Sequence, residues 1–337
     1  MKLRDQILIG LVGGAGLALA GRALLRSRRR IELSGRVVIV TGGSTGLGLL
    51  VARQAAERGA RVVIAARGEV DLRAAEAELR KLGADVLAVP TDVSDEGQVR
   101  TLIARTIEKY GRVDVLVNNA GTIQVGPAEA MTVDDFKTAM ATNFWGELYP
   151  TLAVLPQMRA QGFGRIANVV SVGGKVAVPH LLPYSASKFA LTGLTQGLRS
   201  ELAKENILVT GIYPGTIRTG GHTHAQFKGN KDAEFTWFAL SDVIPGISTS
   251  AESCARALWR AVLDGEPEVI VGWNARLAIA FHNLFPGWTA EAMSLVDRAL
   301  PRHDGSHGGP TRGEDLSGRI PDALNRVIPP GTRPSPA

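Results

Sequence analysis

Three observations predict an α/β fold with a doubly wound parallel sheet. Short β-branched runs alternate with longer helical patterns, the runs lack a regular alternation of polar and apolar residues, and a glycine-rich turn follows the first run. Strands without polar alternation are expected to be buried on both faces. Strands that alternate with helices pair in parallel through right-handed crossovers. Ligands of such folds lie at the carboxyl ends of the strands.

The elements follow one another in a regular order. Strands are expected at Val37–Thr41, Arg61–Ala66, Val86–Val89, Val113–Val117, Ile166–Ser171, Ile207–Tyr213 and Val269–Val271. Helical patterns cover Leu47–Arg58, Asp71–Leu82, Asp95–Tyr110, Val133–Gln161, Tyr184–Glu205 and Ala251–Leu263. We therefore expect a single α/β domain between the two ends of the chain. An apolar helical extension over 273–300 and a low-order, proline- and glycine-rich tail over 301–337 should follow it.

The composition excludes several classes of protein. The chain has 337 residues, of which 45% are hydrophobic and 21% charged, so it is not disordered throughout. Its one cysteine, Cys254, excludes an intramolecular disulfide. Residues 1–36 hold eight basic and two acidic residues and account for the whole net charge of +6. The body is neutral, so no nucleic-acid partner is expected.

The first 30 residues are expected to form a membrane-anchor helix with a basic flank. Ile7–Ala20 carries no charge, and the run from Ile7 to Leu25 is just long enough to cross a thin bilayer if Arg22 is counted within it. Five arginines follow the run: Arg22, Arg26, Arg28, Arg29 and Arg30. Such a cluster resists translocation, which predicts that the body of the protein lies on the cytoplasmic side. A cleaved signal peptide and an amphipathic or buried accessory helix are the alternatives.

The turn after the first strand is typical of a dinucleotide site. It reads Thr41-Gly42-Gly43-Ser44-Thr45-Gly46-Leu47-Gly48. Glycines here allow a tight turn and a close approach of the backbone to a pyrophosphate, which the N-terminus of the next helix attracts. No lysine follows the glycines as it would in a P-loop, which argues against an NTPase.

Tyr184, Lys188 and Ser171 form a candidate set for proton transfer. Tyr184 and Lys188 are four residues apart at the start of a helical pattern and therefore share one face. Because a free tyrosine titrates near pH 10, it needs the nearby ammonium to favour its phenolate. Ser171 ends a strand, where its hydroxyl can hold a substrate oxygen. Each residue alone has an ordinary explanation: a packed ring, a solvated charge and a turn serine.

These motifs together resemble the classical short-chain dehydrogenase/reductase family over about residues 34–272. Besides the glycine turn, the resemblance rests on Asn118-Asn119-Ala120-Gly121, Thr142-Asn143-Phe144-Trp145-Gly146, Ser171, Tyr184-Ser185-Ala186-Ser187-Lys188 and Pro214-Gly215-Thr216-Ile217-Arg218-Thr219. It implies a Rossmann fold and an oxidoreductase that interconverts a carbonyl and an alcohol.

The resemblance also implies a role for each catalytic residue. Tyr184 would be the acid in reduction and the base in oxidation, and Lys188 would bind the nicotinamide ribose and tune Tyr184. Ser171 would orient the substrate oxygen, and Asn143 would hold a water in the proton relay. No position of this tetrad departs from the family pattern. A non-catalytic nucleotide-binding sensor or scaffold, and an epimerase or dehydratase on the same site, remain as alternatives.

The cofactor is expected to be NADP(H) rather than NAD(H). Ala66 stands where similar NAD-dependent members carry an acid, and Arg67 offers a charged fork suited to a 2′-phosphate. Glu69 is an alternative contact to the ribose. The residues that the resemblance places against the cofactor are Gly42, Ser44, Thr45, Gly46, Leu47, Gly48, Arg67, Asp92, Val93, Asn119, Ala120, Gly121, Tyr184, Lys188, Pro214, Gly215, Ile217 and Thr219.

An apolar substrate is expected from the segment after Thr219. The resemblance implies that residues 220–247 form a lid over the substrate. This lid holds Phe227, Phe235, Trp237, Phe238 and Leu240, and the extension adds Leu277, Ile279, Ala280, Phe281, Leu284 and Phe285. The alternative is that these residues pack on the core or on a second subunit of a homo-oligomer. The histidines are expected on surface loops. Because no metal-ligand spacing occurs, no metal is expected.

Overall fold

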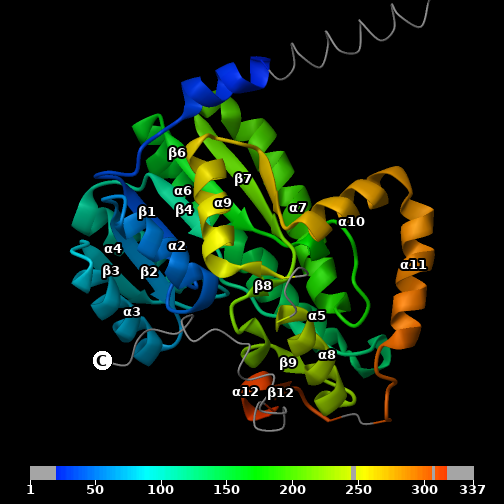
Figure 1. Cartoon of the computed structure of the whole chain (residues 1–337). Coiled ribbons are helices and arrows are strands. Elements are labelled where there is room, and N and C mark those ends of the chain that lie inside the picture. The colour runs from blue at the N-terminus through cyan, green and yellow to red at the C-terminus, as the bar shows by residue number, and fades with distance from the viewer. Residues whose placement is uncertain (1–19, 244–247, 306–307, 317–337) are drawn as a thin grey trace, which may run out of the picture.

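The computed structural model describes residues 20–243, 248–305 and 308–316. Its centre is a sheet of seven parallel strands in the order β3-β2-β1-β4-β6-β7-β11 (Figure 1). The strands are β1 (Val37–Thr41), β2 (Arg61–Ala66), β3 (Val86–Pro90), β4 (Val115–Asn118), β6 (Gly164–Val169), β7 (Ile207–Pro214) and β11 (Glu268–Val271). The prediction of a doubly wound parallel sheet is confirmed.

Two apolar cores lie on the two faces of the sheet. Helices α2 (Gly46–Ala56), α3 (Glu69–Lys81) and α9 (Ala251–Leu263) cover one face. Helices α4 (Glu96–Tyr110), α6 (Gly146–Gln161) and α7 (Leu182–Leu202) cover the other. Successive residues of β1 serve opposite cores: Val38 and Val40 face the first, and Val37 and Ile39 the second. This is why the strand carries no polar alternation.

The helix expected over Val133–Gln161 is in fact interrupted. Helix α5 (Val133–Met140) passes through a π-helical turn, Ala141–Trp145, into α6. A π-turn inserts one extra residue and changes which side chains face inward. Asn143 lies within this turn and is completely buried.

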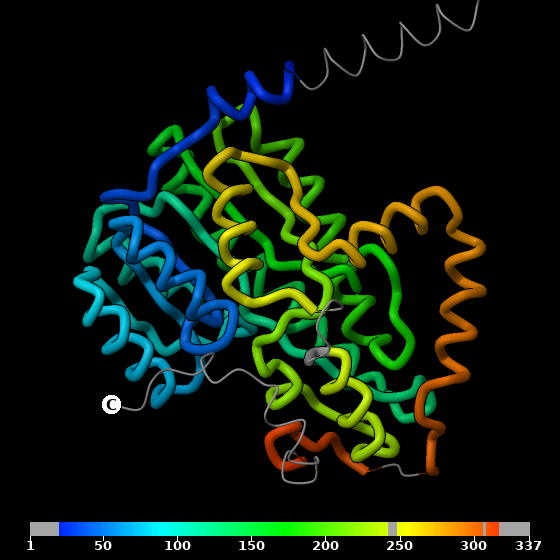
Figure 2. The backbone as a smooth tube through the Cα atoms, in the orientation of Figure 1, coloured from blue at the N-terminus to red at the C-terminus, as the bar shows by residue number. Residues whose placement is uncertain are grey.

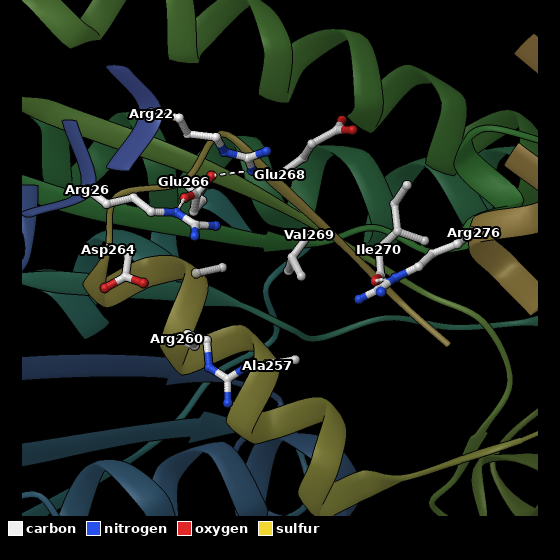
Figure 3. A pocket seen from close by; sticks show the side chains of 11 residues that line it. Arg22, Arg26, Ala257, Arg260, Asp264, Glu266, Glu268, Val269, Ile270 and Arg276 are labelled. Carbon is white, nitrogen blue, oxygen red and sulfur yellow. Dashed lines mark hydrogen bonds and ion pairs between the residues drawn. The ribbon is translucent and has the colours of Figure 1, made fainter. Parts of the chain in front are cut away.

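Residues 20–29 form a helix whose arginines pair with the catalytic domain. Arg22 and Arg26 both bond to the carboxylate of Glu266, in the loop before β11, and Figure 3 shows the two guanidinium groups reaching toward it. In the part of the chain that the structure describes, no helix has the length and hydropathy needed to cross a membrane. Residues 7–19, which carry most of the expected anchor, lie outside the described residues.

The lid segment contains regular structure. Strand β9 (Gln226–Phe227) and helix α8 (Lys231–Val243) lie within it, and β9 joins β5 (Gln124–Val125) and β12 (Thr311–Arg312) in a small sheet. His222, expected on a surface loop, is instead buried and packs against Phe235.

The extension forms two helices, α10 (Trp273–Leu284) and α11 (Pro286–Ala299), that meet at Pro286. Figure 2 shows the chain returning from them beneath α8 to β12 and to α12 (Gly313–Leu316). Leu316 is buried in the apolar cluster of the lid. Part of the segment expected to be a low-order tail is therefore folded onto the domain, while residues 317–337 lie outside the described residues.

Candidate active site

The glycine turn is held in place by contacts that only glycines permit. Gly42 and Gly46 have left-handed backbones, with φ of 63° and 55°. A Cβ on Gly48 would lie 2.0 Å from the carbonyl oxygen of Gly42, so α2 can approach the turn only without a side chain there. Asn119 fixes the other side, because its Nδ2 donates to the carbonyl oxygens of Thr41 and Gly42. The N-terminus of α2 therefore faces the carboxyl end of the sheet.

One cavity of about 890 Å³ at the carboxyl ends of the strands gathers most of the candidate residues. Its lining includes Gly42, Ser44, Thr45, Leu47, Gly48, Arg67, Asp92, Val93, Asn119, Ala120, Gly121, Ser171, Tyr184, Lys188, Pro214, Gly215, Ile217 and Thr219. Gly46 and Asn143 are the candidates outside the lining. The volume lies in the range of cavities that hold cofactor-sized ligands.

Ser171 and Tyr184 converge on Gly173. A Cβ on this glycine would lie 3.2 Å from Cε1 of Tyr184 and 3.5 Å from Oγ of Ser171, so a larger residue would crowd both side chains. Ser171 Oγ accepts a hydrogen bond from the Gly173 N–H at 3.0 Å. Its own proton therefore stays available for a substrate oxygen. Ser171 also has a φ of 148°, a strained conformation of a kind that clusters at functional sites.

Lys188 lies almost fully buried beside the tyrosine. Its Nζ donates to the carbonyl oxygen of Val169 at 2.8 Å and to Oε1 of Glu147 at 3.0 Å. An ammonium has three donors, so one is left for a ligand in the cavity. Glu147 did not stand out in the sequence, because it belongs to no motif and lies 41 residues from Lys188.

Asn143 lies behind the cavity rather than in its wall. Its Oδ1 accepts from the N–H of Thr122, and its Nδ2 donates to the carbonyl oxygen of Thr122 and to Oγ of Ser187. Ser187 Oγ in turn donates to the carbonyl oxygen of Tyr184. These bonds tie the π-turn to the first turns of α7, so Asn143 holds the segment that carries Tyr184.

The far end of the cavity, after β2, carries both signs of charge. Arg67 is exposed, and its Nη1 lies 3.9 Å from Oδ2 of Asp92. Glu69 pairs with Arg73 and is absent from the lining, which disfavours it as the ribose contact. Asp71 does line the cavity, and its place in the first turn of α3 gave no signal in the sequence.

The other end of the cavity is mainly apolar. Trp237 and Phe238 of α8 line it, together with Ile123, Val178 and Leu181. Phe227 and Phe235 instead pack in the core below the lid. Arg312 and Glu314, from the returning C-terminal segment, also reach this wall. They lie 93 and 95 residues beyond Thr219, the last motif residue, and gave no sequence signal.

Two further features lie outside this cavity. A groove of about 460 Å³ runs along β11 between Arg22, Arg260 and Arg276, and none of the motif residues lines it (Figure 3). Among the residues that the structure describes, no group of three or more histidines, cysteines and acids is placed to hold a metal ion.

Comparison with known proteins identifies the family. The model of the short chain dehydrogenase family matches residues 36–228, more than half of the chain. The chain belongs to the short-chain dehydrogenase family. It is 35% identical to an uncharacterized oxidoreductase, YxnA, of Bacillus subtilis over 269 aligned residues. The alignment covers 79% of this chain and 73% of the relative.

Two named reductases are also similar to this short-chain dehydrogenase. The 3-dehydrosphinganine reductase of Danio rerio is 40% identical over 202 residues, which cover 58% of this chain and 61% of that protein. A crystal structure of a variant of actinorhodin polyketide ketoreductase with NADPH has a TM-score of 0.62 and 29% identity, over 71% of this chain and 95% of the other. This chain is therefore similar to oxidoreductases that include two reductases, and the solved structure of one of them contains NADPH.

Proposed function

We propose that this protein is an NADP(H)-dependent reductase of an apolar carbonyl compound, and a dehydrogenase in the reverse direction. The observation that supports this most is the convergence of Ser171, Tyr184 and Lys188 in the cavity that also holds the glycine turn. A dinucleotide can extend from the turn to these side chains. The apolar wall of Trp237 and Phe238 suits a hydrophobic substrate.

The nicotinamide supplies the hydride in reduction when the cofactor is bound. Ser171 donates its free O–H to the substrate oxygen and so orients the carbonyl. Tyr184 gives its phenolic proton to the same oxygen as charge develops there, and Lys188 stabilises the resulting phenolate. Oxidation reverses these roles. Asn143 acts through position, because its bonds hold the start of α7.

The glycine turn and the charge at the end of β2 fit NADP(H). Gly46 has a left-handed backbone that favours glycine, and a Cβ there would lie 3.8 Å from Cβ of Thr219, which lines the cavity. Ala66 brings no acid to the ribose, and Arg67 and Ser44 both line the cavity. Within the described residues, the one charged contact of Arg67 is that with Asp92 at 3.9 Å, which leaves its fork available for a phosphate.

Membrane association is a second, separate part of the proposal. The apolar run Ile7–Leu25 and the arginines after it support an anchor with the catalytic domain on the cytoplasmic side. An apolar substrate, suggested also by the sphinganine reductase among the relatives, is a compound that partitions into lipid. The pairing of Arg22 and Arg26 with Glu266 would hold the body close to such an anchor.

A substrate panel tests the proposed activity. The purified full chain is mixed with long-chain ketones, steroid ketones and β-ketoacyl derivatives, and with NADPH or NADH, and the nicotinamide absorbance is followed. Oxidation of NADPH that exceeds that of NADH is the expected result. Cofactor binding without turnover on any carbonyl would favour the non-catalytic sensor. Conversion without net change in the cofactor would favour an epimerase or dehydratase.

A further inference from the structure

Glu147 is a fully buried carboxyl group in direct contact with the lysine of the site. Its relative exposure is 0%, and its Oε1 accepts from Nζ of Lys188 at 3.0 Å. Its other oxygen, Oε2, has no hydrogen-bond partner in the described structure. A buried carboxylate with one unsatisfied oxygen is costly, so the site favours the neutral acid.

The backbone around Glu147 is held firmly. The carbonyl oxygen of Glu147 accepts from Nδ2 of Asn118 and from Oγ1 of Thr151. Gly146, just before it, packs so closely that a Cβ would lie 2.7 Å from Val93. The π-turn that ends at Trp145 therefore delivers the carboxyl to Lys188 in a fixed position. Glu147 lies one helical turn after Asn143, so both side chains face α7.

The buried pair Asp135–Lys228 shows what a purely structural ion pair looks like in this protein. Asp135 accepts from Lys228 Nζ at 2.7 Å and also from the N–H and the hydroxyl of Thr132. Burial raises the pKa of Asp135, but these donors outweigh it and the net pKa is lowered. Among the described residues, Lys188 is the one donor to the carboxyl of Glu147, and there burial prevails and raises the pKa of Glu147 to about 8.

We propose that Glu147 is a positioning residue that holds Lys188 and exchanges a proton with it, so that the pair restores the proton that Tyr184 gives to the product. This inference rests on the proposed reductase function. Lys188 is the charged group that acts on Glu147 among the described residues, and Tyr184 is the other titratable side chain on that face of α7. The neutral side chains of Asn118 and Thr151 also contact Glu147, through its backbone carbonyl oxygen.

In reduction, one proton passes along Tyr184, Lys188 and Glu147. Tyr184 breaks its O–H bond and protonates the substrate oxygen, while the carbonyl carbon takes the hydride. The Lys188 ammonium then returns a proton to the phenolate, and the resulting amine takes the proton of the Glu147 carboxyl. Glu147 is left as a carboxylate beside an ammonium. After product leaves, solvent in the cavity reprotonates the pair through Lys188, so each turnover consumes one solvent proton.

The substitution Glu147→Gln tests the proton exchange while keeping the shape and an oxygen acceptor for Lys188. Wild-type reduction should slow as pH rises through about 8, because the neutral acid is lost. In the variant, this break in the pH profile of kcat should vanish or move by more than about one pH unit. The kcat itself should fall by about tenfold or more, a smaller loss than the 10²–10⁴-fold expected when a direct acid is removed. An unchanged break with only a lower stability would overturn the proposal.

Asp135→Asn is the matched control, since it removes the carboxylate of a buried pair that does not line the cavity. It should lower the melting temperature and leave the pH profile of kcat as in the wild type. If it abolished the break as well, the break would report stability rather than Glu147.

Infrared titration of the full chain gives a result that does not depend on turnover. The carbonyl band of a protonated carboxyl group should be present at pH 6, disappear above about pH 9, and be missing from Glu147→Gln throughout. A wild type without that band would overturn the inference even if carbonyl reduction is observed. A wild type with the band but without reductase activity would instead overturn the proposed function and leave the proton-exchanging pair standing.

Discussion

Two buried glutamates, Glu147 and Glu266, lie at different places around the same sheet, and their pKa values are shifted in opposite directions. Glu147, behind the cavity, has one donor and one unsatisfied oxygen among the residues that the structure describes, and its pKa is raised to about 8 by burial. Glu266, before β11, receives Arg22 and Arg26 on its two oxygens. Burial also tends to raise the pKa of Glu266, but the hydrogen bonds from the arginines outweigh it and lower the pKa.

The opposite pKa shifts of Glu266 and Glu147 distinguish a carboxylate that stabilises the fold from a carboxyl group that can exchange a proton. At Glu266 and Asp135, where charge holds segments together, two or more donors reach the carboxylate and the ionised form is favoured. At the cavity, an unsatisfied carboxyl, a lysine with a spare donor and a strained Ser171 lie within one site. Such unsatisfied or strained groups cost stability and persist where they serve a function.

Replacing the proposed acid should have the largest effect. Tyr184→Phe removes the phenolic proton and keeps the ring against Gly173, so turnover should fall by about 10²–10⁴-fold with little change in cofactor affinity. Steady-state kinetics with the best carbonyl measures this. Tyr149→Phe is the control, because it keeps the stacking on Trp145 and should leave kcat unchanged. Wild-type turnover by the Tyr184 variant would show that the proton comes from elsewhere.

The next largest effect is expected at the adenosine end of the cavity. Arg67→Ala should weaken NADPH binding by about 1.5–3 kcal/mol, the range for a hydrogen bond to a charged group, and leave NADH nearly unchanged. Fluorescence titration of both cofactors measures this. Arg73→Ala, which loses an exposed arginine paired with Glu69, should change neither affinity. Equal losses for the two cofactors, or a wild-type preference for NADH, would contradict the assignment of the phosphate site.

Glu266→Gln should have a smaller effect, on stability rather than activity. The two arginines are about half exposed, so their pairs together contribute about 1–2 kcal/mol, which corresponds to a few degrees in melting temperature. Because the folded pKa of Glu266 is lowered, this contribution is present above pH 4.5 and is lost as pH falls through the folded pKa.

Glu147 should show the opposite dependence on pH. Its folded pKa is raised, so its contribution to stability is present below pH 4.5 and is lost as pH rises toward about 8. Melting curves at several pH values should therefore show the Glu266→Gln defect shrinking in acid. The Glu147→Gln variant should gain on the wild type as pH rises toward 8. The same pH trend for both variants would contradict the contrast between the two carboxyls.

The smallest effect on activity is expected from removing the apolar N-terminal run. Deletion of residues 1–19 should move the protein from the membrane fraction to the supernatant with unchanged kcat, because Arg22 and Arg26 remain to pair with Glu266. Deletion of residues 1–30 should also release it but should lower the melting temperature, because both pairs are lost. Protein that sediments with membranes after either deletion would place the attachment elsewhere.

The sequence by itself determined the sheet and indicated the central candidate residues of the site. The seven runs correspond to the seven strands of the sheet, because strands buried on both faces carry no regular alternation of polar and apolar residues. Ser171, Tyr184 and Lys188 could be named because a strand end and one helix face bring them to the same edge of a parallel sheet. The glycine turn could be recognised because its backbone conformations exclude other residues.

Only the tertiary structure decided which remote residues join the site. Glu147 meets Lys188 because a π-turn changes the face that α6 presents, and a period of 3.6 residues cannot reveal such a turn. Arg312 and Glu314 reach the cavity because two helices carry the chain back to β9. Arg22 and Arg26 bind Glu266, about 240 residues away, although their composition alone indicated a membrane flank. Pairing across such separations depends on packing in space, which local residue patterns do not encode.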